Sequence, residues 1–170
     1  MGNNDPENIY RGVLISMTLE HDYLLVQNEA GRRSYDFGRK VLQEAGIEAI
    51  LDRHKGVCAN GSTGYVYFTI PDSPHSFSFN VLGHYCAMDY STFVPFGQLE
   101  KIKTAVHDRG YQLELLREEG HEVRIRTFPT KAILSADYQR AARKLAELYA
   151  IVQRQLPQKK RREAPVAKRL

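Results

Sequence analysis

The sequence lacks the features of a secreted, membrane-spanning or disulfide-stabilised protein. It has only two cysteines, Cys58 and Cys86, too few for the disulfide framework of a small secreted domain and typical of a reducing compartment. No apolar run approaches the roughly 18 residues of a membrane span, and the first residues carry neither the basic nor the apolar region of a secretion signal. These absences predict an intracellular protein without a membrane partner, cytoplasmic or, if the source is eukaryotic, nuclear.

The sequence also lacks the short motifs of common catalytic sites. It has no His-Glu-x-x-His zinc motif and no Gly-x-Ser-x-Gly nucleophile motif. The glycine-bearing segment 61–64 has no lysine and runs into a predicted strand, whereas phosphate binding uses the N-terminus of a helix. We therefore expect a protein that acts by binding and not by catalysis.

What the sequence does contain is a concentration of positive charge at its end. Residues 157–170 hold six basic side chains and one acid, a net charge of +5, while the whole chain carries +4. Residues 1–156 therefore carry −1, the difference between the two values. The chain is predicted to consist of one nearly neutral globular domain, residues 1–156, and a flexible basic arm, residues 157–170.

A basic arm attracts phosphate groups without reading sequence, so nucleic acid or another polyanion is its expected partner. Basic residues of the preceding helix would extend the track. The predicted nucleic-acid-binding residues are Arg140, Arg143, Lys144, Arg154, Lys159, Lys160, Arg161, Arg162, Lys168 and Arg169. The alternatives are a solvated terminus that aids solubility, and a nuclear import signal at residues 159–162.

The apolar pattern predicts an α+β domain. Residues 65–70 and 77–82 alternate apolar and polar side chains around a turn-forming segment, which predicts a β-hairpin with Phe68 opposite Phe79. The outward face of this hairpin would carry Tyr65, Tyr67, Thr69, Ser76, Ser78 and Asn80. The two tyrosines could stack on unpaired bases, but tyrosine is common in strands and the surrounding sequence has no local excess of Lys or Arg.

A second hairpin is predicted at residues 111–127, with a three-residue loop ending at Gly120, where glycine can adopt positive φ. Its expected pairs are Leu115 with Val123, Leu113 with Ile125 and Glu114 with Arg124. Residues 10–28 form either a third hairpin or one long helix, and residues 47–51 a strand.

Three helices are predicted from apolar spacing. The first begins at Ser34 and stops at Gly46, the second begins near Leu99 and ends at Gly110, and the longest runs from Ser135 to Pro157. The apolar stripe of the longest helix is Tyr138, Ala142, Leu145, Tyr149, Val152 and Leu156. It would either dock across the sheet or form a homodimer through residues 135–156. The expected fold is an antiparallel sheet of two or three hairpins with helices packed on one face and a long C-terminal helix.

Two further sites are alternatives in which the cysteines carry the chemistry. His54, Cys58, His84 and Cys86 flank the first hairpin and could together complete a tetrahedral zinc shell. Alternatively Cys86 is a nucleophile, with His84 or His75 as its base and Asp89 as the orienting group, which would need a depressed thiol pKa.

Residues 10–37 resemble a short β-rich segment of plasmid-encoded KfrB-type proteins. The matching residues are Tyr10-Arg-Gly12, Val26-Gln27, Gly31-Arg32 and Tyr35-Asp36, with Tyr35 where a histidine precedes the aspartate in that family. The resemblance covers about a sixth of the chain and implies a plasmid or other mobile-element setting. It implies no activity, site or cofactor.

The sequence therefore predicts a non-enzymatic, nucleic-acid-associated accessory or regulatory protein that uses its basic arm. A protein-protein adaptor or inhibitor, acting through the long helix or a hairpin face, is the alternative. A small zinc-stabilised module or Cys/His enzyme is the second alternative.

Overall fold

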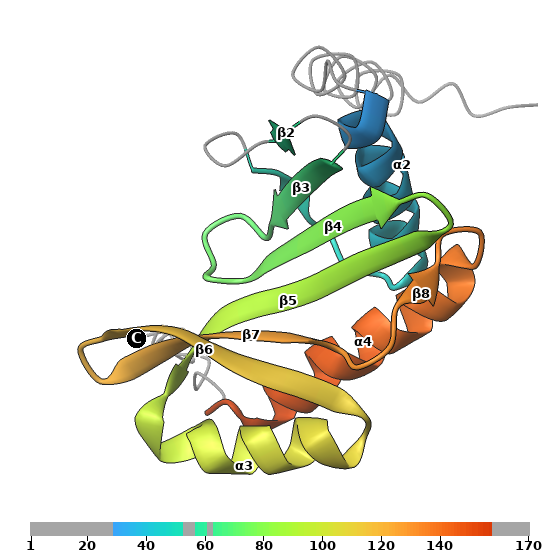
Figure 1. Cartoon of the computed structure of the whole chain (residues 1–170). Helices are drawn as coiled ribbons and strands as arrows, with labels where there is room; N and C mark the ends of the chain where they lie inside the picture. The colour runs from blue at the N-terminus through green and yellow to red at the C-terminus, as the bar shows by residue number, and fades with distance from the viewer. Residues whose placement is uncertain (1–28, 53–56, 61–62, 158–170) are drawn as a thin grey trace, which may run out of the picture.

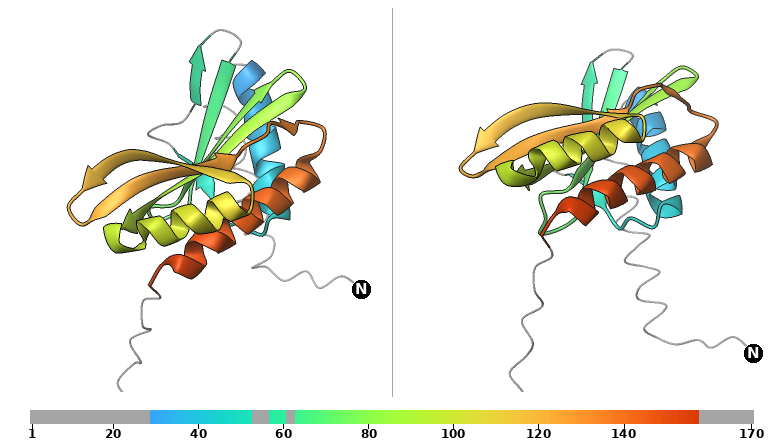
Figure 2. Two further views of the ribbon diagram at one scale, coloured as in Figure 1. Left: turned by 60° about the horizontal axis from the view of Figure 1, so that its bottom comes forward. Right: turned by 90° about the horizontal axis from the view of Figure 1, so that it is seen from below.

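The computed structural model describes residues 29–52, 57–60 and 63–157, and it confirms the predicted α+β fold. In these residues eight strands form one antiparallel sheet in the order β1-β3-β4-β5-β7-β6, with β2 beside β3 and β8 beside β5. Three helices cover one face (Figures 1 and 2), and in the described part of the chain no helix covers the other, which we call the open face.

The elements follow one another in a simple order. The helices are α2 (Glu29–Glu44), α3 (Phe96–Asp108) and α4 (Tyr138–Gln155). The strands are β1 (Ile50–Leu51), β2 (Val57–Asn60), β3 (Thr63–Thr69), β4 (Ser76–Leu82), β5 (Tyr85–Pro95), β6 (Tyr111–Glu119), β7 (Glu122–Pro129) and β8 (Ile133–Leu134). Helix α2 packs on β3 and β4, α3 on β6, and α4 on β5 and β7 between the other two helices.

Helix α2 begins earlier than predicted. Ser34 is not its cap but lies inside it, fully buried, where its Oγ accepts a hydrogen bond from the backbone nitrogen of Val81 at 2.9 Å. The predicted glycine stop is confirmed, because Gly46 has φ +71°. The backbone nitrogen of Ile47 donates a hydrogen bond to the carbonyl of Leu42 at 3.0 Å, which closes a six-residue turn as in a Schellman motif. The side chain of Ser34 thus ties the helix to the sheet.

Glycines allow α2 to approach the sheet closely. A Cβ built on Gly64 of β3 would overlap the backbone nitrogen of Gly31 in α2, and one on Gly38 would lie 2.6 Å from the ring of Phe79. Helix and strand therefore meet backbone to backbone at one end of α2, and helix backbone meets an aromatic ring further along. The core of the domain lies under this contact, where Phe68, Phe79 and Tyr35 are almost fully buried.

The first predicted hairpin is confirmed, but its register differs by two residues. Phe68 pairs with Phe77 and not with Phe79, because the connection is only four residues long and is closed by a hydrogen bond from Ile70 to the carbonyl of His75 at 3.1 Å. Asp72 in this turn adopts φ +57°. A shift of two residues preserves the face of every side chain, so the predicted outward face is correct.

The second hairpin is also shifted. Its loop contains Gly120, which has the expected positive φ of +60°, and His121, so Glu119 pairs with Glu122. The shorter loop alone would place Leu115 opposite Arg126, and a bulge between Leu115 and Arg117 absorbs one residue, so Leu115 faces Ile125 and not the predicted Val123. For the same reason Glu114 pairs with Arg126, and not with Arg124, and the two side chains form an ion pair.

Helix α4 docks across the sheet, as one of the two alternatives predicted. Its cap is Asp137, not Ser135, and accepts a hydrogen bond from the backbone of Arg140 at 3.2 Å. The residues that it buries inside the chain are Ala141, Ala142, Leu145, Leu148 and Val152. Ala142, Leu145 and Val152 of the predicted stripe are among them, so the chain itself covers this part of the stripe. A homodimer through other side chains of residues 135–156 stays a prediction.

Several predicted segments lie outside the described residues. They are the strands or helix at residues 10–28, the proposed zinc ligand His54 and the arm from residue 158 onward. The short strand predicted at 47–51 is reduced to β1. None of the helices that the structure describes combines the length and the apolar character needed to cross a membrane.

Replacing Gly64 with alanine is expected to lower the free energy of unfolding by about 1–3 kcal/mol, because the added Cβ would overlap the backbone of Gly31. Urea denaturation measures the loss. Gly97→Ala is the matched control, because a Cβ there meets no atom within 4 Å and alanine suits a helix better than glycine. A Gly64→Ala chain as stable as the wild type would contradict the close approach of α2 to β3.

Candidate functional site

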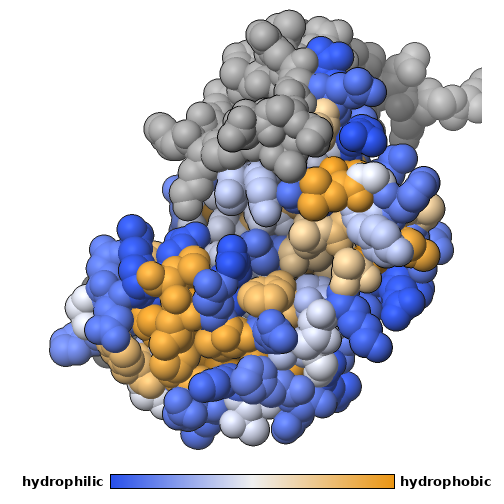
Figure 3. Space-filling model, in the orientation of Figure 1, coloured by the Kyte–Doolittle hydropathy of each residue, from blue (hydrophilic) through white to orange (hydrophobic). Residues whose placement is uncertain are grey.

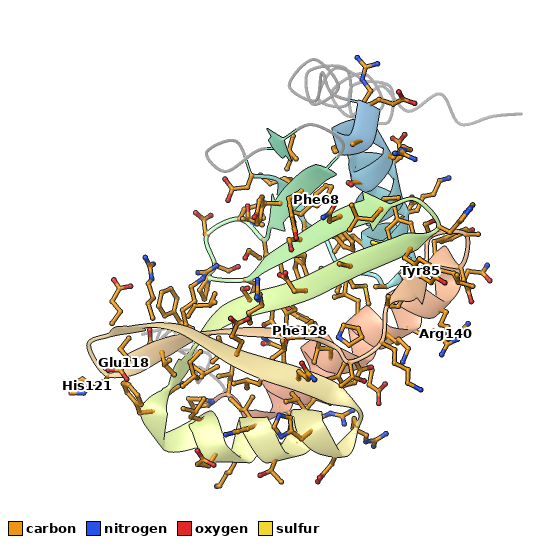
Figure 4. The ribbon with its side chains drawn as sticks, in the orientation of Figure 1. Phe68, Tyr85, Glu118, His121, Phe128 and Arg140 are labelled. Carbon is orange, nitrogen blue, oxygen red and sulfur yellow. The ribbon has the colours of Figure 1, made fainter. Side chains whose placement is uncertain are left out.

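The basic residues predicted on the last helix lie on the outer face of α4. Arg140, Arg143 and Arg154 are exposed, and Lys144 is half-buried with its ammonium group 5.9 Å from the centre of the Tyr111 ring. The buried stripe occupies the opposite side of the helix, and Figure 4 shows Arg140 extending away from the sheet. The three arginines therefore form one outward track along α4, and Lys144 lies at its margin beside Tyr111.

The one acidic residue of α4 does not interrupt this track as a free charge. Glu147 accepts a hydrogen bond from Tyr111 at 2.7 Å and pairs with Arg109 at 3.3 Å. Burial, together with Glu147, raises the pKa of Tyr111, so the tyrosine stays a hydrogen-bond donor. The predicted arm residues Lys159, Lys160, Arg161, Arg162, Lys168 and Arg169 lie outside the described residues.

The strand order separates the cysteines of the proposed zinc shell. Cys58 lies on β2, which pairs with β3, while Cys86 lies on β5, beyond β4. Three strand spacings of about 4.8 Å separate the two backbones by about 14 Å, too far for one tetrahedral ion. The described residues contain no group of three metal-ligating side chains. The prediction assumed that β2 and β5 meet, and the intervening hairpin keeps them apart.

The proposed cysteine nucleophile does not form either. Burial raises the pKa of Cys86 to about 12, so its thiol stays protonated, and it contacts the carbonyl of Ala87 at 3.3 Å. Asp89 follows Cys86 by three residues on β5, so its side chain faces the opposite side of the sheet. His75 lies beside Tyr90, about 13 Å along β5 from Cys86. His84 is exposed in the β4–β5 turn.

His75 instead completes a buried polar cluster under α4. The hydroxyl of Tyr90 lies 2.7 Å from Nδ1 of His75 and accepts a hydrogen bond from Gln153 at 3.0 Å. Tyr149 packs against both rings. Burial lowers the pKa of His75 and raises that of Tyr90, so both are neutral near pH 7. This cluster is structural, because Tyr90 is fully buried and the cluster joins α4 to the sheet.

The open face carries the feature that sequence reasoning missed. Along β4 and β5 the small polar side chains of Ser76, Ser78 and Asn80 are nearly fully buried although no described helix covers them. Longer side chains from neighbouring strands shield them: Arg124 of β7 donates a hydrogen bond to Ser76 at 3.1 Å. The result is a polar floor between taller aromatic and arginine side chains.

A gap in the sheet deepens this floor into a cavity. β7 pairs with β5 as far as Tyr90, and β8 pairs with β5 from Cys86. Between these points β5 contributes residues 87–89, whereas the facing chain contributes residues 128–132, two residues more. The extra chain bulges outward and leaves a cavity of about 290 Å³ against the unpaired edge of β5.

Asp89 is one of the residues that line the cavity. Its Oδ2 accepts a hydrogen bond from Ser78 at 2.7 Å, and Ser78 is its sole hydrogen-bond donor among the residues that the structure describes. Burial raises the pKa of Asp89, while the hydrogen bond from Ser78 and the charge of Arg126 oppose that shift. Beside the cavity, Oδ1 of the buried Asn80 has no described partner.

Aromatic and cationic side chains line the cavity with Asp89. Tyr65 and Phe128 are two of them, and Phe128 lies near the middle of the open face (Figure 4), where apolar and hydrophilic side chains lie next to one another (Figure 3). Arg126 and Lys131 line it as well, and the Arg126 guanidinium lies 5.6 Å from the centre of the Phe128 ring. The sequence did contain a signal: Arg124, Arg126 and Phe128 alternate with apolar residues in β7. Only the pairing of β7 with β5 brings them to the tyrosine face.

The chain was compared with family models, curated proteins and solved structures, and none of the three comparisons gave a match. The resemblance of residues 10–37 to KfrB-type proteins falls mostly outside the described residues, which begin at Glu29. That resemblance, and the mobile-element setting that it implies, stay predictions.

The stability of the domain is expected to fall from about pH 7.5 to about pH 5, partly through His75. Its folded-state pKa is below the ordinary 6.5, so the unfolded chain binds the proton more readily as the pH falls through 6.5. Urea unfolding of His75→Gln should show a shallower fall than the wild type, because this titration is removed. His107→Gln, at an exposed position of α3, is the control. Equal slopes for His75→Gln and the wild type would refute a buried neutral His75.

Proposed function

We propose that this protein binds nucleic acid through the outer face of α4 and the basic arm that follows it. The observation that carries the proposal is the presentation of Arg140, Arg143 and Arg154 on one outward face that leads directly to residue 157. Residues 135–170 contain ten basic side chains and three acids. One of those acids, Glu147, is already paired with Arg109.

The dimensions of this track suit a phosphate backbone. Arg140 and Arg154 are fourteen residues apart, which corresponds to about 21 Å along the helix axis. A nucleic-acid duplex carries one negative charge per about 1.7 Å of its axis, so several phosphates lie within reach of the helix. Binding of this kind is sequence-independent and weakens as salt concentration rises. It accounts for attraction to nucleic acid and leaves target choice to the body of the protein.

Binding to a fluorescein-labelled duplex of about 20 base pairs, followed by anisotropy over a salt series, tests the proposal. The double variant Arg140→Ala/Arg143→Ala should weaken binding and reduce the log-log salt slope by about one to two. Truncation after Leu156 should reduce it further, because six basic residues are removed. Lys101→Ala/Lys103→Ala removes two exposed charges from α3 and is the matched control.

A slope that is unchanged in both the double variant and the truncated chain would show that neither α4 nor the arm contacts phosphate. Equal losses in the α3 control would show that net charge, and not the track, determines binding.

An exposed apolar row favours a protein-protein adaptor as the second candidate. Tyr85 pairs with Leu82 on one side and Leu134 on the other, so the three side chains lie in a row on the open face, and all three are about half exposed. A partner whose binding is lost in Tyr85→Ser and kept after truncation at Leu156 would support this candidate over nucleic-acid binding.

A further inference from the structure

The cavity at the gap in the sheet combines a carboxylate acceptor with positive charge. Oδ2 of Asp89 accepts a hydrogen bond from Ser78, while Oδ1 has no donor among the described residues. Lys131 lines the cavity at an exposed position, whereas Arg126 already pairs with Glu114 and lies close enough to Asp89 to act on its charge. A ligand that suits this lining presents N–H donors to Asp89 and negative charge to Lys131.

The walls add a third requirement. Tyr65 and Phe128 line the cavity from β3 and β7, with aromatic surface that favours a flat ring. A simple organic cation would satisfy Asp89 but would be repelled by Lys131, and a simple anion would be repelled by Asp89. A nucleotide meets all three requirements, because its base is flat, the base edge carries N–H groups and its phosphate is anionic.

We propose that this cavity binds the base of a guanine nucleotide, free or within a single strand, with Asp89 accepting the N1–H and N2–H groups of the base. These two N–H groups are parallel, as in a guanidinium group, and a carboxylate accepts such a pair in bidentate fashion. Adenine and cytosine present only one amino group at that edge. Burial of Asp89 strengthens the interaction, because water competes poorly for the carboxylate there.

The unpaired edge of β5 supports the same ligand. Residues 87–89 line the cavity and have no strand partners on that side, so the backbone groups among them that point away from β4 are available to a base edge. The volume of about 290 Å³ lies at the lower end of the range for small-ligand sites, which suits one base with its phosphate outside.

This pocket goes beyond the phosphate track, because it reads the base and because Tyr65, Ser78 and Asp89 of its lining belong to the open face, opposite the helices. A phosphate-binding arm does not distinguish guanine from hypoxanthine. Base preference therefore reports on the pocket alone, and duplex binding and its salt slope report on the track. If the pocket shows no base preference, duplex binding by the track can still be measured, and the reverse also holds.

Isothermal titration of the full-length protein with GMP, IMP, AMP and CMP tests the pocket. GMP should bind about tenfold more tightly than IMP, which lacks only the 2-amino group, because a hydrogen bond to a charged acceptor is lost. AMP and CMP should also bind more weakly than GMP. A single-stranded oligonucleotide with one guanine, compared with the same strand containing inosine, distinguishes a strand from a free nucleotide as the source. A preference in either format supports the pocket.

Two variants separate recognition from folding. Asp89→Asn should abolish the preference for GMP over IMP while keeping the contact with Ser78 and a urea midpoint no lower than that of the wild type, because a buried charge is removed. Phe128→Ala should weaken GMP binding about tenfold through lost stacking. The matched controls, Asp108→Asn and Phe96→Ala, change exposed residues of α3 and should leave both quantities unchanged.

Equal affinities for GMP and IMP in both formats, or a preference that survives in Asp89→Asn, would overturn the proposal. Binding of free amino acids without binding of nucleotides would also overturn it, since an α-ammonium could pair with Asp89 and a carboxylate with Lys131.

Discussion

Phe77, Phe79 and Tyr90 lie beneath the helices, and this packing orients every other side chain of β4 and β5. Because successive residues of a strand point to opposite faces, burying these aromatic rings under α2 and α4 forces Ser78, Asn80 and Asp89 onto the open face. The close approach of α2 at Gly64 and the cluster around Tyr90 hold the helices in place. The polar floor is thus a consequence of how the core is packed, and its residues need no separate scaffold.

The faces of the strands could be predicted from the sequence, whereas the registers and long-range pairings could not. Alternation assigned Phe68 and Tyr65 to opposite faces correctly, and a register error of two residues left that assignment intact. Both loops are shorter than predicted, because Ile70 bonds to His75 in the first hairpin and Glu119 pairs with Glu122 in the second. The bulge at residue 116 of β6 then shifts the second register by one further residue. Ser34 was expected to cap a helix, and only the position of Val81 explains why it lies inside one.

The candidate pocket escaped sequence reasoning for a physical reason. Tyr65 and Phe128 are far apart in the chain and belong to strands that are separated by β4 and β5, so no local spacing relates them. The gap arises from the mismatch between residues 87–89 and 128–132, which is visible only once both pairings of β5 are known. The basic track of α4 could be predicted from the sequence, because the helical period alone places Arg140, Arg143 and Arg154 on one face.

The two candidate sites differ in how their charges are balanced, and this difference separates their roles. On α4 the acid Glu147 is already paired at the surface, so the surrounding cations present net positive charge to the solvent at long range. In the cavity, Asp89 and Arg126 lie close enough to perturb each other, and Glu114 pairs with Arg126 as well, so little net field extends outward. A surface of the first kind accelerates encounter with a polyanion, and a site of the second kind acts only at contact, through hydrogen-bond geometry. Under the two proposals, attraction and discrimination therefore lie on opposite faces of the same sheet.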